Sequence, residues 1–367
     1  MTPNSYDRAS RTLEKLLKDD DQKVIALTGS WGTGKTCLWQ RMSSQKFNRT
    51  SVYVSLFGVK STQELKLRLL SAAINGNNVD KGVATILDGL VKKFTGASLS
   101  EVGTFGLPQL LKDKLVVFDD LERKNKSLET DEIMGFIDEF SQQYNVSFLL
   151  LLNTNRLDDK GLWQTLHEKV IDVEVCLLPQ PSEAFDIAKA ARNYNFSEIV
   201  KTALMILGVT NIRVMRRVLR VIAAIWNVKG SESVIKNWAA VTVLMTCSHF
   251  RAVEDLPTLD YIIEYRPYRG LFGKEEMRSP QHQKWDQLIQ ALDIYRPDNF
   301  EILLRDYLLT GHLNDQELQD VFVTYSRAKE GEAADLQFKE FITQALWGTQ
   351  YDDKELRTLA EELLPGW

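Results

Sequence analysis

One segment of the chain has the residue types and the spacing that bind a polyphosphate. Residues 29–36 fit the pattern G-x-x-x-x-G-K-[ST] at every fixed position. Glycines let the backbone curl so that successive N–H groups face one centre, which suits a phosphate oxyanion. We expect the Lys35 ammonium to reach the outer phosphates and the Thr36 hydroxyl to bind Mg²⁺. The segment therefore predicts a site for a nucleoside triphosphate and Mg²⁺, formed by Gly29, Ser30, Trp31, Gly32, Thr33, Gly34, Lys35, Thr36 and Cys37.

A second pattern, further along the chain, supplies carboxylates. Residues 115–118 are apolar and predict a buried strand, and Asp119 and Asp120 follow directly. We expect Asp119 to hold Mg²⁺, directly or through water, and Asp120 to orient or deprotonate the attacking water. Many hydrolases of this kind carry glutamate at the second position, and the shorter Asp120 shifts where that water must sit. Two aspartates after apolar residues also fit a plain strand-end turn, so the prediction depends on the phosphate-binding segment before them.

Amide side chains end the next apolar run. Residues 149–152 are leucines, and Asn153 and Asn155 come soon after them. If this strand lies beside the one that ends at Asp119, Asn153 or Asn155 could face the γ-phosphate or the water. A simple Asx turn explains these amides equally well.

The same region contains a resemblance to a guanine-reading motif. Residues 155–158, Asn-Arg-Leu-Asp, are similar to the N-K-x-D motif of GTPases. Those enzymes also need Asp-x-x-Gly after the central strand, and this chain has Glu122 where the glycine would stand. The sequence therefore favours ATP over GTP.

Arginines gather on one face of a predicted helix. They recur at positions 213, 216, 217 and 220, with the spacing i, i+3, i+4 and i+7. We expect Arg213, at the start of this helix, to contact the γ-phosphate from a helical lid. A stripe that contacts nucleic acid and a plain solvated surface are the alternatives.

Another arginine, Arg123, follows the two aspartates closely. It sits beyond the strand end and is placed to point away from its own site. In oligomeric ATPases such a residue can complete a neighbour's site as an arginine finger. Arg123 is therefore a candidate for that role.

The hydrophobic pattern predicts a scaffold that brings these strand ends together. Apolar strands are expected at 24–27, 51–56, 115–118, 147–152 and 170–178, between helices at 10–18, 35–42, 63–74, 83–93 and 131–143. Strands that alternate with helices imply a parallel, doubly wound α/β sheet. From residue 182 onward helical patterns dominate, with helices expected at 314–326, 335–347 and 352–364. The prediction is a P-loop NTPase sheet over residues 1–178, a helical lid over 179–250 and an all-α C-terminal domain over 251–367.

Length and composition limit the possible classes of protein. The chain has 367 residues, 44% hydrophobic and 26% charged, which are ordinary globular values. It has no run of 18 apolar, uncharged residues and no apolar core of a secretory signal, so no membrane contact is expected. Three cysteines, Cys37, Cys176 and Cys247, show neither metal nor disulfide spacing. These features together predict a cytoplasmic protein.

Charge is distributed unevenly along the chain. The formal net charge is −5, but residues 274–367 carry 10 Lys and Arg against 19 Asp and Glu. A general electrostatic grip on nucleic acid is therefore not favoured, although it stays open. The helical C-terminal region is expected to contact a protein partner or a second copy of the chain, with a solvated helical surface as the alternative.

The motifs together resemble the KAP group of P-loop NTPases, in the division that includes AAA+ and STAND ATPases. The resemblance covers residues 6–226 and uses residues 29–36, residues 119–123 (Asp-Asp-Leu-Glu-Arg) and residues 211–213 (Asn-Ile-Arg). Glu122 stands for the usual Asp, and Ile212 for the usual Pro. Many members insert membrane helices between the two nucleotide motifs, and this chain does not. The resemblance implies ATP hydrolysis and a role in bacterial antiviral defence.

The leading prediction is a Mg²⁺-dependent ATPase that works as a molecular switch or assembly platform. Three alternatives stay open at this stage. The first is a P-loop kinase or another phosphotransferase, the second an ATPase stimulated by nucleic acid. The third is a nucleotide-gated scaffold with negligible turnover.

Overall fold

The computed structural model describes residues 4–44, 50–75, 106–154, 167–190, 197–227, 232–266, 279–294 and 298–328, together with Leu157, Gln164 and Lys339. The predicted helices at 83–93 and 352–364, nearly all of the helix predicted at 335–347, and Asn155 lie outside these residues. The chain forms two compact units, residues 1–187 with 210–212 and residues 188–209 with 213–367, and each is described by itself. The predicted division at residues 178 and 250 stays a prediction.

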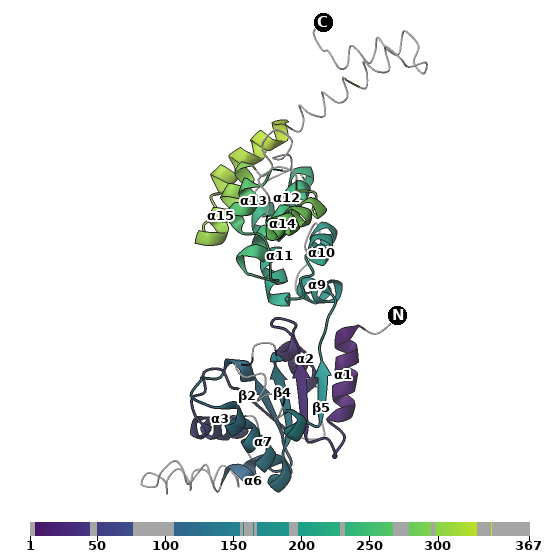
Figure 1. The fold of residues 1–367 in the computed structure, drawn as a ribbon, viewed down its shortest axis with the longest axis vertical. Coiled ribbons are helices and arrows are strands. Elements are labelled where there is room, and N and C mark those ends of the chain that lie inside the picture. Colours follow the sequence, from purple (N-terminus) through teal and green to yellow (C-terminus); the bar gives the residue numbers. More distant parts are fainter. Residues whose placement is uncertain are drawn as a thin grey trace, which may run out of the picture. The chain divides into compact units, whose positions relative to one another are not determined.

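A five-stranded parallel sheet forms the centre of the first unit (Figure 1). Its strands are β1 (Val24–Thr28), β2 (Ser51–Ser55), β3 (Leu115–Asp119), β4 (Ser147–Leu152) and β5 (Val173–Cys176). They lie in the order β2-β3-β4-β1-β5, and every neighbouring pair is parallel. The carboxyl ends of β1, β4 and β3 therefore meet at one edge, with β4 between the other two. This arrangement confirms the predicted parallel, doubly wound α/β sheet.

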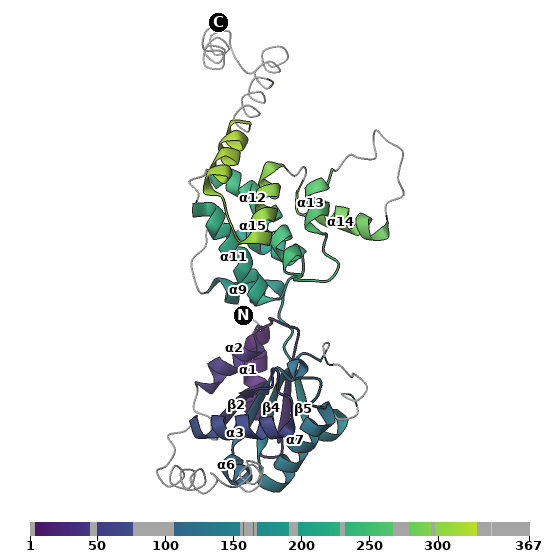
Figure 2. The same ribbon diagram turned by 90° about the vertical axis from the view of Figure 1, so that its left-hand side faces the viewer.

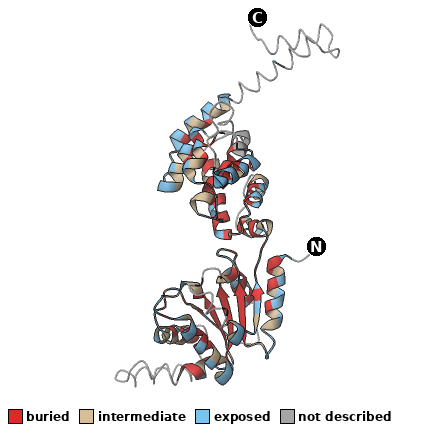
Figure 3. Cartoon of the chain, in the orientation of Figure 1, coloured by how far each residue is buried: buried red, intermediate tan, exposed pale blue. Residues whose placement is uncertain are grey.

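Helices cover both faces of this sheet. They are α1 (Ser5–Leu16), α2 (Lys35–Ser43), α3 (Thr62–Asn75), α6 (Leu107–Leu111) and α7 (Thr130–Tyr144), with a short 3₁₀ helix η1 (Leu121–Arg123) after β3. Helices α3, α6 and α7 pack over one face, and α1 lies on the other side against α2 and β5 (Figures 1 and 2). Every residue of β1, β3 and β4 is buried (Figure 3). Their unbroken apolar runs follow from this cover on both faces.

The predicted bounds of α1 and β5 were wrong: each element ends two residues earlier than predicted, at Leu16 and Cys176, and their starts differ by more. Helix α1 begins at Ser5 and not at residue 10, because the Asn4 side chain accepts a hydrogen bond from the Asp7 N–H (2.8 Å) and caps the helix. Strand β5 begins at Val173 and not at residue 170, because residues 167–170 are still helical. Neither difference changes which residues form the phosphate-binding segment or supply the two carboxylates.

The described part of the second unit is helical, as the pattern after residue 182 predicts. Helix α9 (Pro181–Lys189) leads into it, followed by α10 (Ser197–Ile206), α11 (Ile212–Asn227), α12 (Glu232–His249), α13 (Leu259–Glu264), α14 (Pro280–Ala291) and α15 (Asn299–Thr310), and residues 315–328 are helical too. Aromatic rings hold α12 against its neighbours: Trp238 stacks on Phe300 at 4.1 Å and meets Phe322 edge-on. Among the residues that the structure describes, no helix is long and apolar enough to cross a membrane.

Candidate functional site

The phosphate-binding segment joins β1 to α2 at the carboxyl edge of the sheet. Gly32 and Gly34 have φ values of 76° and 91°, which lie in the left-handed region that favours glycine. Gly34 is the N-cap of α2 and has no side chain to bond the first N–H groups of that helix. Those N–H groups and the positive end of the helix dipole are the features that attract a phosphate. The fold therefore gives the segment the geometry that its sequence predicts.

Lys35 folds back over the segment. Its ammonium donates to the carbonyls of Gly29 (2.7 Å) and Ser30 (3.1 Å), and the residue is only 8% exposed. A buried ammonium needs acceptors, and neutral carbonyls are weaker acceptors than a charged phosphate oxygen. Lys35 is therefore held at the place where a phosphate would offer it a better partner.

The two motifs meet through a hydroxyl and a carboxylate. Thr36 Oγ1 donates to Asp119 Oδ2 at 2.7 Å, across 83 positions of sequence. Asp119 is 5% exposed, and its other oxygen accepts the Asp120 N–H at 2.8 Å. A threonine hydroxyl and an aspartate carboxylate are hard oxygen donors of the kind that Mg²⁺ takes. The residues present therefore fit the cation that the phosphate-binding segment implies.

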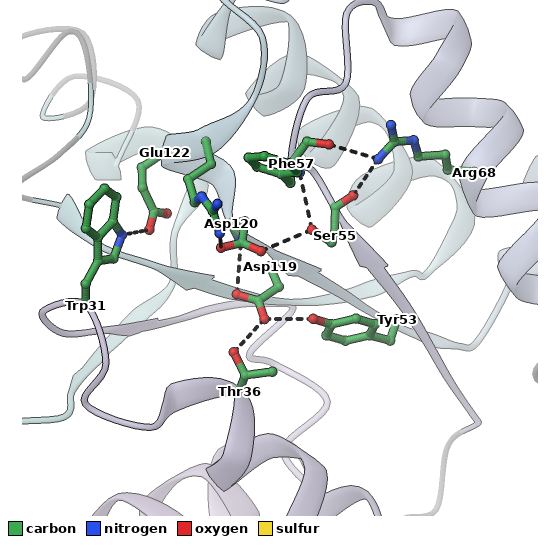
Figure 4. Close-up of polar contacts among 10 residues, drawn as sticks. Trp31, Thr36, Tyr53, Ser55, Phe57, Arg68, Asp119, Asp120 and Glu122 are labelled. Carbon is green, nitrogen blue, oxygen red and sulfur yellow. Dashed lines mark hydrogen bonds and ion pairs between the residues drawn. The ribbon is translucent and has the colours of Figure 1, made fainter. Parts of the chain in front are cut away.

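Strand β2 adds a contact that the sequence analysis missed. Tyr53 Oη donates to Asp119 Oδ2 at 2.8 Å, the same oxygen that accepts from Thr36 (Figure 4). Burial raises the pKa of the Tyr53 hydroxyl above its usual range, and the hydrogen bond to Asp119 raises it further. The hydroxyl therefore stays protonated and keeps its role as a donor.

The Asp120 carboxylate is held by a hydrogen bond from β2. Its backbone is left-handed (φ 59°), and its carboxylate accepts from Ser55 Oγ at 3.1 Å and from Arg123 Nη1 at 3.3 Å. Arg123 also lies over the ring of Phe57, with its guanidinium carbon 4.2 Å from the ring centroid. The sequence analysis expected Arg123 to point away from its own site. In this structure its guanidinium lies on Asp120, and its role in a neighbouring site stays a prediction.

The tip of the phosphate-binding segment is tied to η1. Trp31 is 46% exposed, yet its indole N–H donates to Glu122 Oε1 at 2.7 Å (Figure 4). The other carboxylate oxygen, Glu122 Oε2, is buried with no hydrogen-bond partner among the described residues. This bond joins the segment after β1 to the segment after β3.

Residues 210–212 also lie against the phosphate-binding segment, inside the first unit. The Ile212 N–H donates to the Gly32 carbonyl at 2.9 Å, and a Cβ on Gly32 would lie 1.9 Å from Asn211 Oδ1. On the same segment, Tyr6 Oη of α1 donates to the Thr33 carbonyl at 2.7 Å. The backbone angle of residue 32 therefore favours glycine, and any Cβ there would force the Asn211 side chain to move.

The other predicted residues differ in how far the structure places them. Asn153 is 5% exposed and directly follows β4, so it lies at the edge between the phosphate-binding segment and Asp119. Cys37 is an exposed free cysteine in α2. Arg213 follows Ile212 in α11 but belongs to the second unit, so its predicted contact with the γ-phosphate stays a prediction.

Comparison with known proteins gives similarity to solved structures alone. No family model matches the chain, and no curated protein matches it. Cdc6p from Pyrobaculum aerophilum is 15% identical, with a TM-score of 0.46, over 83% of this chain and 83% of that one. The Aeropyrum pernix ORC1 protein in complex with DNA is 15% identical, with a TM-score of 0.38, over 88% and 93% of the two chains. A Thermotoga maritima RuvB variant is 15% identical, with a TM-score of 0.36, over 83% and 86%. No function is transferred to this chain from similarities of this size.

Proposed function

We propose that the chain binds ATP with Mg²⁺ and hydrolyses it. The observation that carries this proposal is the 2.7 Å contact between Thr36 Oγ1 and Asp119 Oδ2. If the glycine-rich turn and the turn after β3 had unrelated roles, nothing would require their side chains to lie in contact. A site that binds Mg²⁺ and phosphate together requires this contact. The same contact supports the predicted assignment of Thr36 and Asp119 as the residues that hold Mg²⁺.

Each side chain in the site has a role in this proposal. The ammonium of Lys35 exchanges its carbonyl partners for phosphate oxygens, and the N–H groups of residues 29–36 surround the polyphosphate. When bound, Mg²⁺ neutralises charge that develops on the phosphates. Asp120 orients the attacking water and accepts its proton through acceptor sites that Ser55 and Arg123 leave open on its carboxylate. Asn153 and Arg213 are the proposed contacts to the γ-phosphate.

The wider role that we propose is a molecular switch or assembly platform. Its support is the resemblance to the KAP group and the helical, acidic C-terminal region, which suits a protein partner or a second copy of the chain. The proposed setting is the cytoplasm, and antiviral defence is an implication of the resemblance. Direct contact with nucleic acid is not favoured, because residues 274–367 are strongly acidic.

The experiment that tests the proposal compares phosphate release by the full chain with and without Mg²⁺. We expect release from ATP that stops when the metal is chelated. Asp120→Asn should still bind ATP but release phosphate at least about 100-fold more slowly, since a general base usually contributes about 100- to 10,000-fold. Asp21→Asn, at an exposed position in the turn after α1, is the matched control and should keep the full rate. Equal rates for Asp120→Asn and the control would overturn the proposed role of Asp120. A wild-type chain without release would overturn hydrolysis itself.

A further inference from the structure

Tyr53 occupies a place on β2 from which few side chains could reach the metal-binding carboxylate. Along β2 the burial alternates, with Val52 and Val54 in the core and Tyr53 and Ser55 more exposed. In the register of the sheet Tyr53 pairs with Val117, two residues before Asp119. A strand rises about 3.3 Å per residue, so Asp119 lies about 7 Å further along the strand than Val117. A long side chain with a donor at its tip is needed to span this distance, and Tyr53 Oη arrives at 2.8 Å.

The donors around Asp119 fix both of its oxygens. Oδ1 accepts the Asp120 N–H at 2.8 Å, while Oδ2 accepts from Thr36 Oγ1 at 2.7 Å and from Tyr53 Oη at 2.8 Å. A carboxylate bonded at both oxygens cannot rotate freely about its Cβ–Cγ bond. Two of these donors belong to the backbone and to the phosphate-binding segment, as expected for such a site. The third, Tyr53, comes from a strand that carries neither motif.

We propose that Tyr53 is a positioning residue for Mg²⁺, which acts by holding the Asp119 carboxylate in the orientation that binds the cation. This inference rests on the proposed function and deepens it. Tyr53 as a residue is 40% exposed, so packing alone does not account for a tyrosine at this position. Groups that hydrogen-bond a metal ligand set its orientation, and their removal typically weakens metal binding by about 10–100-fold.

The test is Tyr53→Phe in the full chain, since phenylalanine keeps the ring and removes the donor. Binding of a fluorescent ATP analogue is titrated with Mg²⁺ and, separately, measured in EDTA. We expect the half-saturating Mg²⁺ concentration to rise about 10-fold or more. Binding in EDTA should be unchanged, and phosphate release at saturating Mg²⁺ should be close to wild type. A residue that only packs against its neighbours is not expected to change the Mg²⁺ affinity while leaving the maximal rate of phosphate release unchanged.

Tyr144→Phe is the matched control, because Tyr144 ends α7 and packs against Phe140. Its Mg²⁺ titration should overlay that of the wild type. If Tyr53→Phe also overlays the wild type while both bind ATP in a Mg²⁺-dependent way, the positioning role is overturned and the proposed function stands. An equal loss of binding in EDTA and in Mg²⁺ would also overturn it. If the wild-type chain shows no Mg²⁺-dependent binding, the proposed function fails and the role of Tyr53 fails with it.

Discussion

The packing of residues 210–212 against the phosphate-binding segment can be tested most directly at Gly32. A Cβ at this position would lie 1.9 Å from Asn211 Oδ1 and 2.3 Å from Asn211 Cγ, and φ is 76°. Two separate costs therefore act on Gly32→Ala. An L-residue in the left-handed region costs about 1–2 kcal/mol, and forcing a methyl group into a filled space costs about 1–3 kcal/mol. We expect a loss of about 2–5 kcal/mol in the free energy of unfolding of the first unit.

The two costs can be separated in a double-mutant cycle. Asn211→Ala removes the three Asn211 atoms that a Cβ on Gly32 would meet. In that background only the backbone cost remains, so Gly32→Ala should cost at least about 1 kcal/mol less than in the wild type. The assay is urea unfolding of the wild type, the two single variants and the double variant.

Gly58→Ala is the matched control for this cycle. Gly58 has a φ of 70°, and nothing lies within 4 Å of a Cβ built on it. Its substitution should cost about 1–2 kcal/mol, with or without Asn211. If Gly32→Ala cost no more than Gly58→Ala, and equally in both backgrounds, the close approach of Asn211 to the phosphate-binding segment would be refuted.

Two further predictions concern Glu301 in the second unit and Trp31 in the phosphate-binding segment. Burial raises the pKa of Glu301 from its ordinary 4.5 to about 7, so the folded chain keeps a proton that the unfolded chain releases. Stability should therefore fall as pH rises from about 4.5 to about 7, by at most about 1.4 kcal/mol per pH unit from this group. Glu301→Gln should flatten that slope in urea unfolding at several pH values, and an unchanged slope would contradict the assignment. In the site, Trp31→Phe removes the donor to Glu122 Oε1 at an exposed position and should cost about 0.5–1.5 kcal/mol, the usual net contribution of one hydrogen bond. The same substitution in a Glu122→Ala background, which removes the acceptor, should cost less, and an equal cost in both backgrounds would mean that this bond contributes nothing.

The parts of the site that depend on local spacing could be predicted from the sequence. Residues 29–36 have fixed positions for the glycines, the lysine and the threonine, and each has a local physical reason. The apolar runs that became β1, β3 and β4 are buried on both faces, so they are unbroken and easy to recognise. The cap that starts α1 was equally local, because Asn4 stands directly before the helix. The helix expected at 10–18 starts five residues too late, although Asn4 carries the capping signal.

The contacts that depend on the register of the sheet could not be predicted. Tyr53 and Ser55 alternate with buried valines, and the sequence shows this alternation. It does not show that β2 pairs with β3, with Tyr53 opposite Val117 and Ser55 opposite Asp119. Only in this register does the Tyr53 hydroxyl reach Asp119 and the Ser55 hydroxyl reach Asp120. The close approach of the Asn211 side chain to Gly32 likewise joins residues that are far apart in sequence. These contacts arise from tertiary packing, for which a single sequence carries no local signal.

The central claim is that the backbone around residues 29–36, with the Lys35 ammonium, binds the phosphates of ATP. Isothermal titration of the purified full chain with ATP and Mg²⁺ tests it most directly. Lys35→Ala is compared with Lys18→Ala, whose ammonium is exposed in the turn that follows α1. We predict saturable heat for the wild type and for Lys18→Ala, and none for Lys35→Ala. Equal heat from Lys35→Ala, or no heat from the wild type, would contradict the claim.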